Sequence, residues 1–263
     1  DRPLKKADNT WTYFAADAAY HYDKYKRNYT SIINVWGADH GGYIKRIEGI
    51  IKTVSDSKIN FDVKLCQLVN LSKGGKPVKM SKRAGNFVTM KNVIDTVGPD
   101  VLRFIMLTRK NDAPLDFDLV KVKEQSKDNP VYYVQYANIR INSLYEKAKT
   151  HGIDLSDDLN NINFKLLENI SEINLIKLIS KWPRQVEAAA RANEPHRITF
   201  YLNELAGAFH SFWSNGNDNP SLRFINDSNK DLTIARLSLA KIVKIILCSG
   251  LSILGVKPAE KLS

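Results

Sequence analysis

The pattern of apolar residues changes once along the chain, near Leu119. Before that residue, short apolar runs that favour strands alternate with helical patterns. After it, apolar residues recur at the spacing of amphipathic helices, and no strand pattern remains. The sequence therefore predicts an α/β domain over residues 1–118, followed by an all-helical bundle over residues 119–263. With 263 residues, the chain is long enough for two ordinary domains.

The clearest strand of the first domain is predicted at residues 31–36, which read SIINVW. Such an unbroken apolar run is typical of a buried parallel strand. A glycine-rich turn follows at residues 37–42, and residues 43–54 then carry apolar side chains at helical spacing. Open α/β sheets bind nucleotides at strand-to-helix turns of this kind. Two alternatives stay open here, because Asp39 could cap the helix and His40 could be a structural histidine.

An alanine-rich helix is predicted over residues 12–21. Tyr13 and Asp17 are one helical turn apart, so a phenol and a carboxylate share one face. A carboxylate in this position is suited to binding a cationic ligand such as a guanidinium. The alternative is a surface acid on an ordinary amphipathic helix.

Residues 63–94 form a strongly basic segment without any Asp or Glu. Its positive field suits a polyphosphate. An alternating strand over residues 60–71 and a hairpin turn at Gly74–Gly75 lead into it, and Thr89 can begin a helix after it. The sequence predicts a mobile phosphate-binding loop at residues 79–83, with a solvated hairpin tip as the alternative. The basic residues are Lys64, Lys73, Lys76, Lys79, Lys82, Arg83 and Lys91.

Further along, a helix is predicted to start at Pro99 and a turn at residues 114–118. The net charge of +11 indicates a polyanionic partner such as nucleic acid. No apolar run approaches the ~20 residues of a membrane span, and no signal peptide is present, so no membrane partner is expected. Cys66 and Cys248 lie in apolar contexts without metal-ligand spacing, which predicts reduced core residues of a cytoplasmic protein and no metal site.

Several stretches, taken in order, resemble the C-terminal part of the arginyl-tRNA synthetases. The sequence Lys79-Met80-Ser81-Lys82-Arg83 is similar to the KMSKS signature of class I aminoacyl-tRNA synthetases, with Arg83 at the last position. The resemblance extends almost from end to end of the chain. The other matching stretches are residues 12–17, 37–40, 84–90, 116–118, 128–137, 194–197, 205–210 and 254–256.

This resemblance implies the C-terminal portion of a Rossmann-type catalytic domain, joined to an α-helical anticodon-binding domain. It implies activation of L-arginine with ATP and Mg²⁺ to arginyl-adenylate, and transfer to tRNA(Arg), by a monomeric protein. Carried over by position, the resemblance implies that the arginine side chain is bound by Tyr13, Asp17 and His40. It implies that ATP is bound by Gly37, Asp39, Lys79, Met80, Ser81 and Lys82, of which Lys79 and Lys82 stabilise the pyrophosphate. It implies that anticodon bases are bound by Tyr133 and Tyr136.

The chain also departs from the family pattern. Gly41 stands where a second histidine is usual, and Asn138 replaces a histidine that is common after Gln-Tyr-Ala. No H-x-G-H, the other half of the class I ATP site, occurs among the five histidines. Because the chain also begins at Asp1 without a Met, we expect it to be part of a longer protein and inactive alone.

Two other functions are compatible with parts of the sequence. A class I synthetase of another specificity, such as the cysteine enzyme, would need a zinc-binding set of thiols, and two cysteines are too few. A non-catalytic RNA-binding module derived from a synthetase has no such requirement and stays open. An H-x-G-H upstream of Asp1 would distinguish this module from the arginine-specific enzyme.

Overall fold

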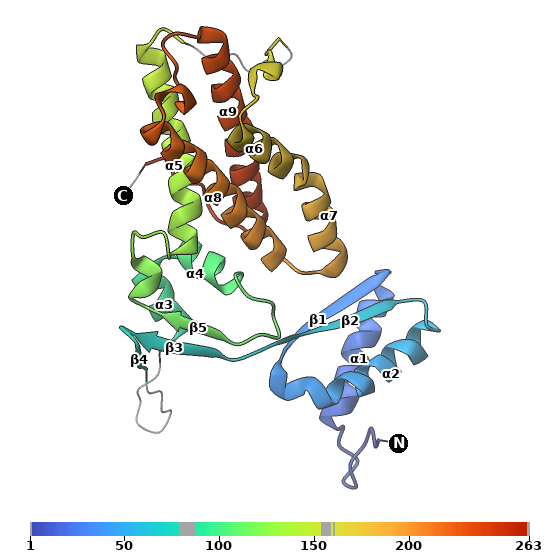
Figure 1. The fold of residues 1–263 in the computed structure, drawn as a ribbon. Helices are drawn as coiled ribbons and strands as arrows, with labels where there is room; N and C mark the ends of the chain where they lie inside the picture. The colour runs from blue at the N-terminus through green and yellow to red at the C-terminus, as the bar shows by residue number, and fades with distance from the viewer. Residues whose placement is uncertain (1, 79–87, 154–158, 160, 262–263) are drawn as a thin grey trace. The chain divides into compact units, whose positions relative to one another are not determined.

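The computed structural model describes residues 2–78, 88–153, 159 and 161–261 (Figure 1). The predicted phosphate-binding residues 79–83 lie outside the described residues. Two compact units are present, one formed by Asp1–Asn70 with Asn111–Leu115 and the other by Leu71–Lys110 with Asp116–Ser263. The boundary predicted after residue 118 stays a prediction.

In the first unit, two helices accompany a pair of parallel strands (Figure 1). Its elements are α1 (Tyr13–Lys26), β1 (Ser31–Gly37), the 3-10 helix η1 (Ala38–Tyr43), α2 (Ile44–Ser55) and β2 (Asn60–Cys66). Strand β1 pairs with β2 from Ser31 opposite Asn60 to Gly37 opposite Cys66. Thr12 begins α1, and its hydroxyl accepts a hydrogen bond from the backbone N–H of Ala15.

Strand β1 confirms the predicted parallel strand but is buried on one face only. Ile32 joins Ile47 and Ile51 in the core, whereas Val35 is 67% exposed. Cys66 is also exposed, so the prediction that it is a core residue was wrong. It occupies the last position of β2, where the strand leaves its ladder.

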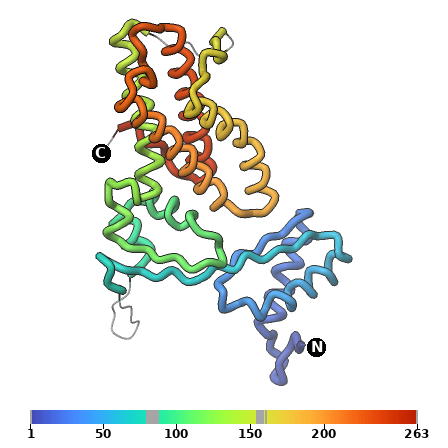
Figure 2. The backbone as a smooth tube through the Cα atoms, in the orientation of Figure 1, coloured from blue at the N-terminus to red at the C-terminus, as the bar shows by residue number. Residues whose placement is uncertain are grey.

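A three-stranded sheet, in the order β4–β3–β5, brings together segments that are far apart in sequence (Figure 2). Its strands are β3 (Val69–Lys73), β4 (Lys76–Pro77) and β5 (Leu115–Asp118). The turn between β3 and β4 needs glycine because Gly74 and Gly75 have φ values of 59° and 78°. The turn predicted at residues 114–118 was wrong, since alternate burial of Leu115 and Phe117 stabilises a strand there.

Two short helices follow the basic segment as predicted. They are α3 (Met90–Val97) and α4 (Pro99–Met106). Thr89 and Asn92 form a capping box at the start of α3. Pro99 occupies the first turn of α4, directly after Gly98 with φ of 83°.

The predicted helical periodicity after residue 119 is confirmed by long helices packed around α8 (Figure 1). These helices are α5 (Pro130–Thr150), α6 (Ile170–Ser180), α7 (Trp182–Ala192), α8 (His196–Asp218) and α9 (Lys230–Ile253). Short 3-10 turns lie between them and before α5 at η2 (Lys121–Lys123), η3 (Phe164–Leu166) and η4 (Pro220–Leu222). A Cβ atom at Gly250 would lie 2.5 Å from Leu202, so glycine lets α9 approach α8 closely.

A buried ion pair ties α6 to α9. The Arg236 Nε atom donates to Glu172 Oε1 at 2.6 Å, and both side chains are almost fully buried. Arg236 also donates to the carbonyl oxygens of Ser221 and Arg223 at 2.7 Å, so its guanidinium is well satisfied. Among the described residues, no helix is both long and apolar enough to cross a membrane.

Candidate functional site

A pocket of about 450 Å³ opens in the first unit, between α1, β1 and η1. Its wall is mixed, with a carboxylate, an ammonium group, two imidazoles and aromatic rings. The lining residues used below are Asp17, His21, Lys24, Asn34, His40 and Tyr43. The structure thus brings together Asp17 and His40, two of the three residues that the resemblance assigns to the arginine side chain.

The Asp17 carboxylate is held in the pocket by a residue distant in sequence. The Tyr43 hydroxyl donates to Asp17 Oδ2 at 2.9 Å. Burial and this hydrogen bond raise the pKa of Tyr43, so the phenol stays protonated and remains a donor. Among the described residues, Asp17 Oδ1 has no hydrogen-bond or ion-pair partner. One oxygen of an oriented carboxylate is therefore available to a cationic ligand.

A chain of hydrogen bonds supports Asp17 from behind. His21 Nδ1 lies 2.8 Å from the Asp17 carbonyl oxygen, which can only accept, so this nitrogen carries the proton. The other ring nitrogen accepts from Asn34 Nδ2 at 2.8 Å, and Asn34 Oδ1 accepts from Lys24 Nζ at 2.9 Å. Burial lowers the pKa of His21, in keeping with a neutral ring. Sequence reasoning missed Asn34, although an amide inside an apolar strand was a signal.

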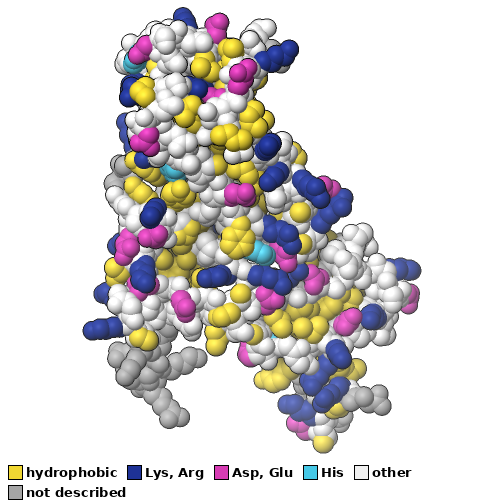
Figure 3. Space-filling model, in the orientation of Figure 1, with side chains coloured by type: hydrophobic (Ala, Val, Ile, Leu, Met, Phe, Trp, Pro, Cys, Tyr) yellow, Lys and Arg dark blue, Asp and Glu magenta, His cyan; other side chains and the backbone are white. Residues whose placement is uncertain are grey.

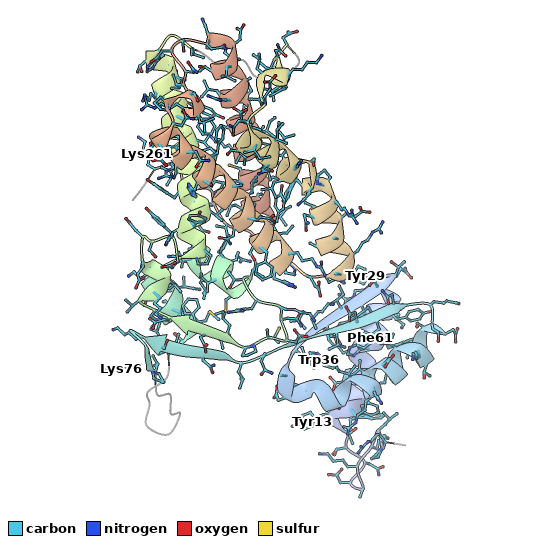
Figure 4. The ribbon with its side chains drawn as sticks, viewed as in Figure 1. Tyr13, Tyr29, Trp36, Phe61, Lys76 and Lys261 are labelled. Atoms are coloured by element: carbon cyan, nitrogen blue, oxygen red, sulfur yellow. The ribbon has the colours of Figure 1, made fainter. Side chains whose placement is uncertain are left out.

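The other predicted residues of this unit lie at the pocket's margin or outside it. Tyr13 is 90% exposed and does not line the pocket, although it begins α1 one turn before Asp17 (Figure 4). Asp39 does not cap α2; its Oδ2 atom lies 3.5 Å from His40 Nε2. A Cβ atom at Gly37 would lie 2.5 Å from Asp39 Oδ1, so glycine lets this carboxylate fold back over the chain.

The hairpin that leads into the basic segment is fastened by Asp118. Its Oδ1 atom accepts from the N–H groups of Gly74 at 3.0 Å and Val120 at 2.8 Å. Its Oδ2 atom accepts from the Gly75 N–H at 2.6 Å and the Ser72 hydroxyl at 3.2 Å. These backbone donors, with that of Gly75 first, hold the pKa of Asp118 well below its usual range. No local pattern around Asp118 in the sequence indicates this role.

Aromatic and basic side chains meet on the helical unit where α5 faces α8. The rings of Tyr132 and Tyr136 stack with centroids 5.5 Å apart, and the Arg140 guanidinium covers Tyr136 at 4.4 Å. Tyr133 packs on His210 with centroids 4.5 Å apart. Tyr133 and Tyr136, which sequence reasoning singled out, are thus both in contact with His210. Tyr132, which stacks on Tyr136, is a further member of this group that it missed.

His210 fixes the geometry of this aromatic group. Its Nε2 atom donates to the Tyr133 carbonyl oxygen at 3.0 Å, so Nδ1 is the acceptor for Arg140 Nη1 at 3.0 Å. Only a neutral imidazole can make both bonds. Burial and the nearby Arg140 charge lower the pKa of His210, which favours that neutral state.

Positive charge is spread over both units rather than confined to one loop. Figure 3 shows Lys and Arg side chains distributed over the visible face of each, with Asp and Glu interspersed. Among the described residues, no group of three or more His, Cys, Asp or Glu side chains could hold a metal ion.

Comparison with known proteins finds similar sequences and similar structures. Residues 134–262 match the family described as DALR anticodon binding domain. Over 264 residues, the chain is 57% identical to an arginine–tRNA ligase of Parvibaculum lavamentivorans, covering 100% of this chain and 45% of that protein. An arginine–tRNA ligase of Ruegeria pomeroyi is 55% identical with the same coverage. The chain therefore spans less than half the length of these relatives.

Solved structures agree with this relationship. A Campylobacter jejuni structure titled as an arginyl-tRNA synthetase superposes with a TM-score of 0.85 at 34% identity, over 100% of this chain and 55% of that one. The Thermus thermophilus arginyl-tRNA synthetase gives a TM-score of 0.68 at 18% identity, over 98% of this chain and 50% of that one. The second similarity is one of fold alone.

Proposed function

Since this chain belongs, along its whole length, with the C-terminal part of the arginine–tRNA ligases, we propose that it supplies the amino-acid pocket and the tRNA-binding helices of such an enzyme. In the complete protein, the reaction is ATP-dependent activation of L-arginine to arginyl-adenylate, followed by transfer to tRNA(Arg). The protein acts in the cytoplasm as a monomer.

The observation that carries this proposal is the oriented carboxylate of Asp17. A guanidinium is planar and permanently charged, and a carboxylate engages it through parallel charge-assisted hydrogen bonds. Tyr43 holds one oxygen of Asp17 while the other has no partner among the described residues. This arrangement favours arginine over amino acids whose side chains lack a cationic fork.

Lys24 is the competing positive charge in the same pocket. Its ammonium donates to Asn34 Oδ1 at 2.9 Å and lies 4.3 Å from the centre of the Tyr20 ring. These two partners satisfy the ammonium at the Asn34 side of the pocket. The Asp17 carboxylate therefore does not form an ion pair with Lys24 and is available to a cationic ligand.

The remaining roles rest on the sequence match and on position. His40 lines the edge of the arginine pocket. Tyr13, one helical turn before Asp17, binds the arginine side chain by its position in the sequence match. Gly37 and Asp39 contact the adenosine at the strand-to-helix turn. Lys79 and Lys82, with Met80 and Ser81 between them, bind ATP and stabilise the pyrophosphate as it leaves.

The helical unit binds the anticodon loop of the tRNA. Single-stranded RNA loops are recognised by stacking of unpaired bases on aromatic side chains and arginine planes. The Tyr132–Tyr136 stack, capped by Arg140, offers such a surface on α5. Tyr133 supports it through His210.

Replacing Asp17 by Asn in the complete enzyme tests the arginine pocket. The variant keeps the size of the side chain but loses the charge, so kcat/KM for arginine should fall by ~100-fold or more while KM for ATP barely changes. Asp23→Asn is the matched control, because Asp23 lies on the same helix, pairs with Arg27 at the surface and does not line the pocket. Near-normal arginine kinetics for Asp17→Asn, with folding confirmed by circular dichroism, would contradict the assignment.

We further propose that this chain alone does not activate arginine. Half of the class I ATP site, the H-x-G-H motif, is absent from its sequence. Arginine-dependent exchange of pyrophosphate into ATP should therefore be undetectable with residues 1–263 alone and present with the complete protein. Exchange at comparable rates by both would overturn this part of the proposal.

A further inference from the structure

Asn34 is a buried amide in a strand that is otherwise largely apolar. It shares the buried face of β1 with Ile32 and is only 6% exposed. A buried amide is stable only where its donor and acceptor groups find partners, because an unsatisfied polar group costs free energy. Asn34 also lines the pocket that holds Asp17, and both ends of its carboxamide have partners there.

The orientation of the Asn34 amide is fixed by His21. His21 Nδ1 donates to the carbonyl oxygen of Asp17 at 2.8 Å, so Nε2 carries no proton in the neutral ring and accepts from Asn34 Nδ2 at 2.8 Å. The His21 ring is buried, which disfavours a second proton. The Asn34 oxygen therefore points away from His21 and accepts from Lys24 Nζ at 2.9 Å.

The two partners of Asn34 require opposite kinds of group. The ammonium of Lys24 only donates hydrogen bonds, whereas Nε2 of the neutral His21 ring only accepts. A carboxamide presents an acceptor at one end and a donor at the other, a carboxylate presents two acceptors, and an aliphatic group presents neither. The side chain of Asn34 is therefore matched to His21 and Lys24 together.

Lys24 lies on the same face of α1 as Asp17, seven residues further along, and both side chains line the same pocket. Long side chains on a helix point back towards its N-terminus, so the lysine stem is directed towards Asp17. Within the described part of the chain, Asn34 is the hydrogen-bond acceptor of Lys24, and the Tyr20 ring is its other partner. An ammonium group that loses this acceptor is attracted to the nearby carboxylate.

We propose that Asn34 is a positioning residue for arginine binding, which holds the Lys24 ammonium away from Asp17 so that the carboxylate stays open to the substrate guanidinium. This inference rests on the proposed function, since it concerns the same arginine pocket. Without Asn34, the Lys24 ammonium moves towards Asp17, and its charge opposes the entry of a second cation. The competition weakens binding of the guanidinium in the ground state and in the transition state alike, so it raises KM for arginine and leaves kcat nearly unchanged.

Steady-state aminoacylation of tRNA(Arg) by the complete enzyme tests this role. Asn34→Leu keeps a side chain of similar size but removes both polar groups. KM for arginine should rise about fivefold, the effect of one partly exposed ion pair, at unchanged kcat and unchanged KM for ATP. The melting temperature is measured alongside and should fall, because His21 loses its hydrogen-bond donor.

A second substitution separates competition by Lys24 from a loss of packing. Adding Lys24→Met to Asn34→Leu keeps the apolar stem of the lysine and removes its charge, so KM for arginine should return close to that of the unsubstituted enzyme while the melting temperature stays low. Adding Lys26→Met instead is the matched control, because Lys26 is on the same helix, lies over the Tyr22 ring and does not line the pocket. This control should not restore KM.

Two single variants provide the test if Asn34→Leu does not fold. Asn34→Asp keeps an acceptor for Lys24, and Lys24→Met leaves no competing charge, so neither should raise KM for arginine. A raised KM in Lys24→Met would show that the ammonium itself binds the substrate, which overturns the inference. A raised KM in a folded Asn34→Asp variant would overturn it as well, because Lys24 still has its acceptor there.

Failure of this inference can be distinguished from failure of the proposed function. If Asp17→Asn leaves the arginine kinetics near normal, the pocket is not the arginine site, and both are overturned. If Asp17→Asn is impaired but Asn34→Leu has a normal KM for arginine, the arginine pocket stands and the role of Asn34 alone is overturned. The same conclusion follows if Asn34→Leu has a raised KM that Lys24→Met does not restore.

Discussion

The Oδ2 atom of Asp118 lies 2.6 Å from the backbone nitrogen of Gly75, although 43 residues separate them. This contact joins the end of β5 to the turn that leads into the basic segment. A carboxylate that accepts several backbone N–H groups is strongly favoured in its charged form. The geometry of the turn therefore depends on one charged side chain.

Asp118→Asn should loosen this hairpin. The amide group keeps the size of the side chain but turns one acceptor into a donor that faces the N–H groups of Gly74 and Gly75. We expect a lower melting temperature and, in the complete enzyme, a lower kcat at similar KM for ATP. Asp95→Asn, on an exposed face of α3, should change stability by no more than about 0.5 kcal/mol.

Lowering the pH should weaken the hydrogen bonds of Asp118 within a defined pH range. The carboxyl titrates near 3.8 when unperturbed, and its pKa is lowered in the folded chain. Its contribution to stability is therefore complete above about pH 3.8 and is lost as the pH falls through the lower folded value. Denaturation curves measured between pH 5 and 2 should show that the free energy of unfolding falls less steeply with pH in Asp118→Asn than in the unsubstituted protein. Identical slopes for the two proteins would show that Asp118 does not contribute to the loss of stability in acid.

The buried histidines should also make the protein less stable as the pH falls, but at higher pH than Asp118 does. His210 has a lowered pKa because of burial and Arg140, whereas an unperturbed imidazole titrates near 6.5. Below that value the unfolded chain takes up a proton that the folded chain refuses, so stability falls as the pH decreases. One such group contributes a slope of at most about 1.4 kcal/mol per pH unit.

His210→Gln separates this contribution from that of other groups. The variant should be less stable at pH 8, because the bonds to Tyr133 and Arg140 are impaired, and its stability should depend less on pH between 7 and 5. Equilibrium unfolding in urea at each pH provides both quantities. A variant with an unchanged pH slope would show that His210 does not titrate differently in the folded chain.

The tyrosines of α5 should divide into a stacking residue and a packing residue. Tyr132 is partly exposed, and among the described residues its ring contact is with Tyr136, so we expect a base to extend this stack. Tyr132→Ala should weaken tRNA binding by about 1–3 kcal/mol with a small change in melting temperature. Tyr133→Ala should instead lose stability, since this ring packs on His210 and lies 3.7 Å from the Cβ position of Gly207. The reverse pattern would exchange the two roles.

The features that could be predicted from sequence are those that depend on neighbours within a few residues. Helical periodicity, the Thr89 cap and the glycine turn at Gly74–Gly75 are local, and the structure confirms them. A turn was wrongly predicted at residues 114–118 because Pro114 and Asp118 favour turns. The strand observed there depends on pairing with β3, which is distant in sequence. Asp17 could be proposed from helical spacing, but its hydroxyl partner lies 26 residues away and only folding brings it there.

Tyr43→Phe tests whether that hydroxyl orients Asp17. The phenyl ring can keep the edge contact with Phe14, at 6.3 Å, and the packing on the core of Ile32, Ile47 and Ile51, so the fold should be retained. The carboxylate, however, loses the donor at 2.9 Å and is free to rotate. Hydrogen bonds to charged groups are typically worth about 1.5–3 kcal/mol, so kcat/KM for arginine should fall about 10- to 100-fold.

The loss should appear mainly in KM for arginine, because a rotating carboxylate binds the guanidinium less well in the ground state as well as in the transition state. Tyr22→Phe, on the exposed side of the same helix α1, is the matched control and should behave like the unsubstituted enzyme. Combining Tyr43→Phe with Asp17→Asn should cost little more than Asp17→Asn alone, since the hydroxyl acts through the carboxylate. Fully additive losses would show that Tyr43 contacts arginine by itself, and an unaltered KM in Tyr43→Phe would show that the orientation of Asp17 has another source.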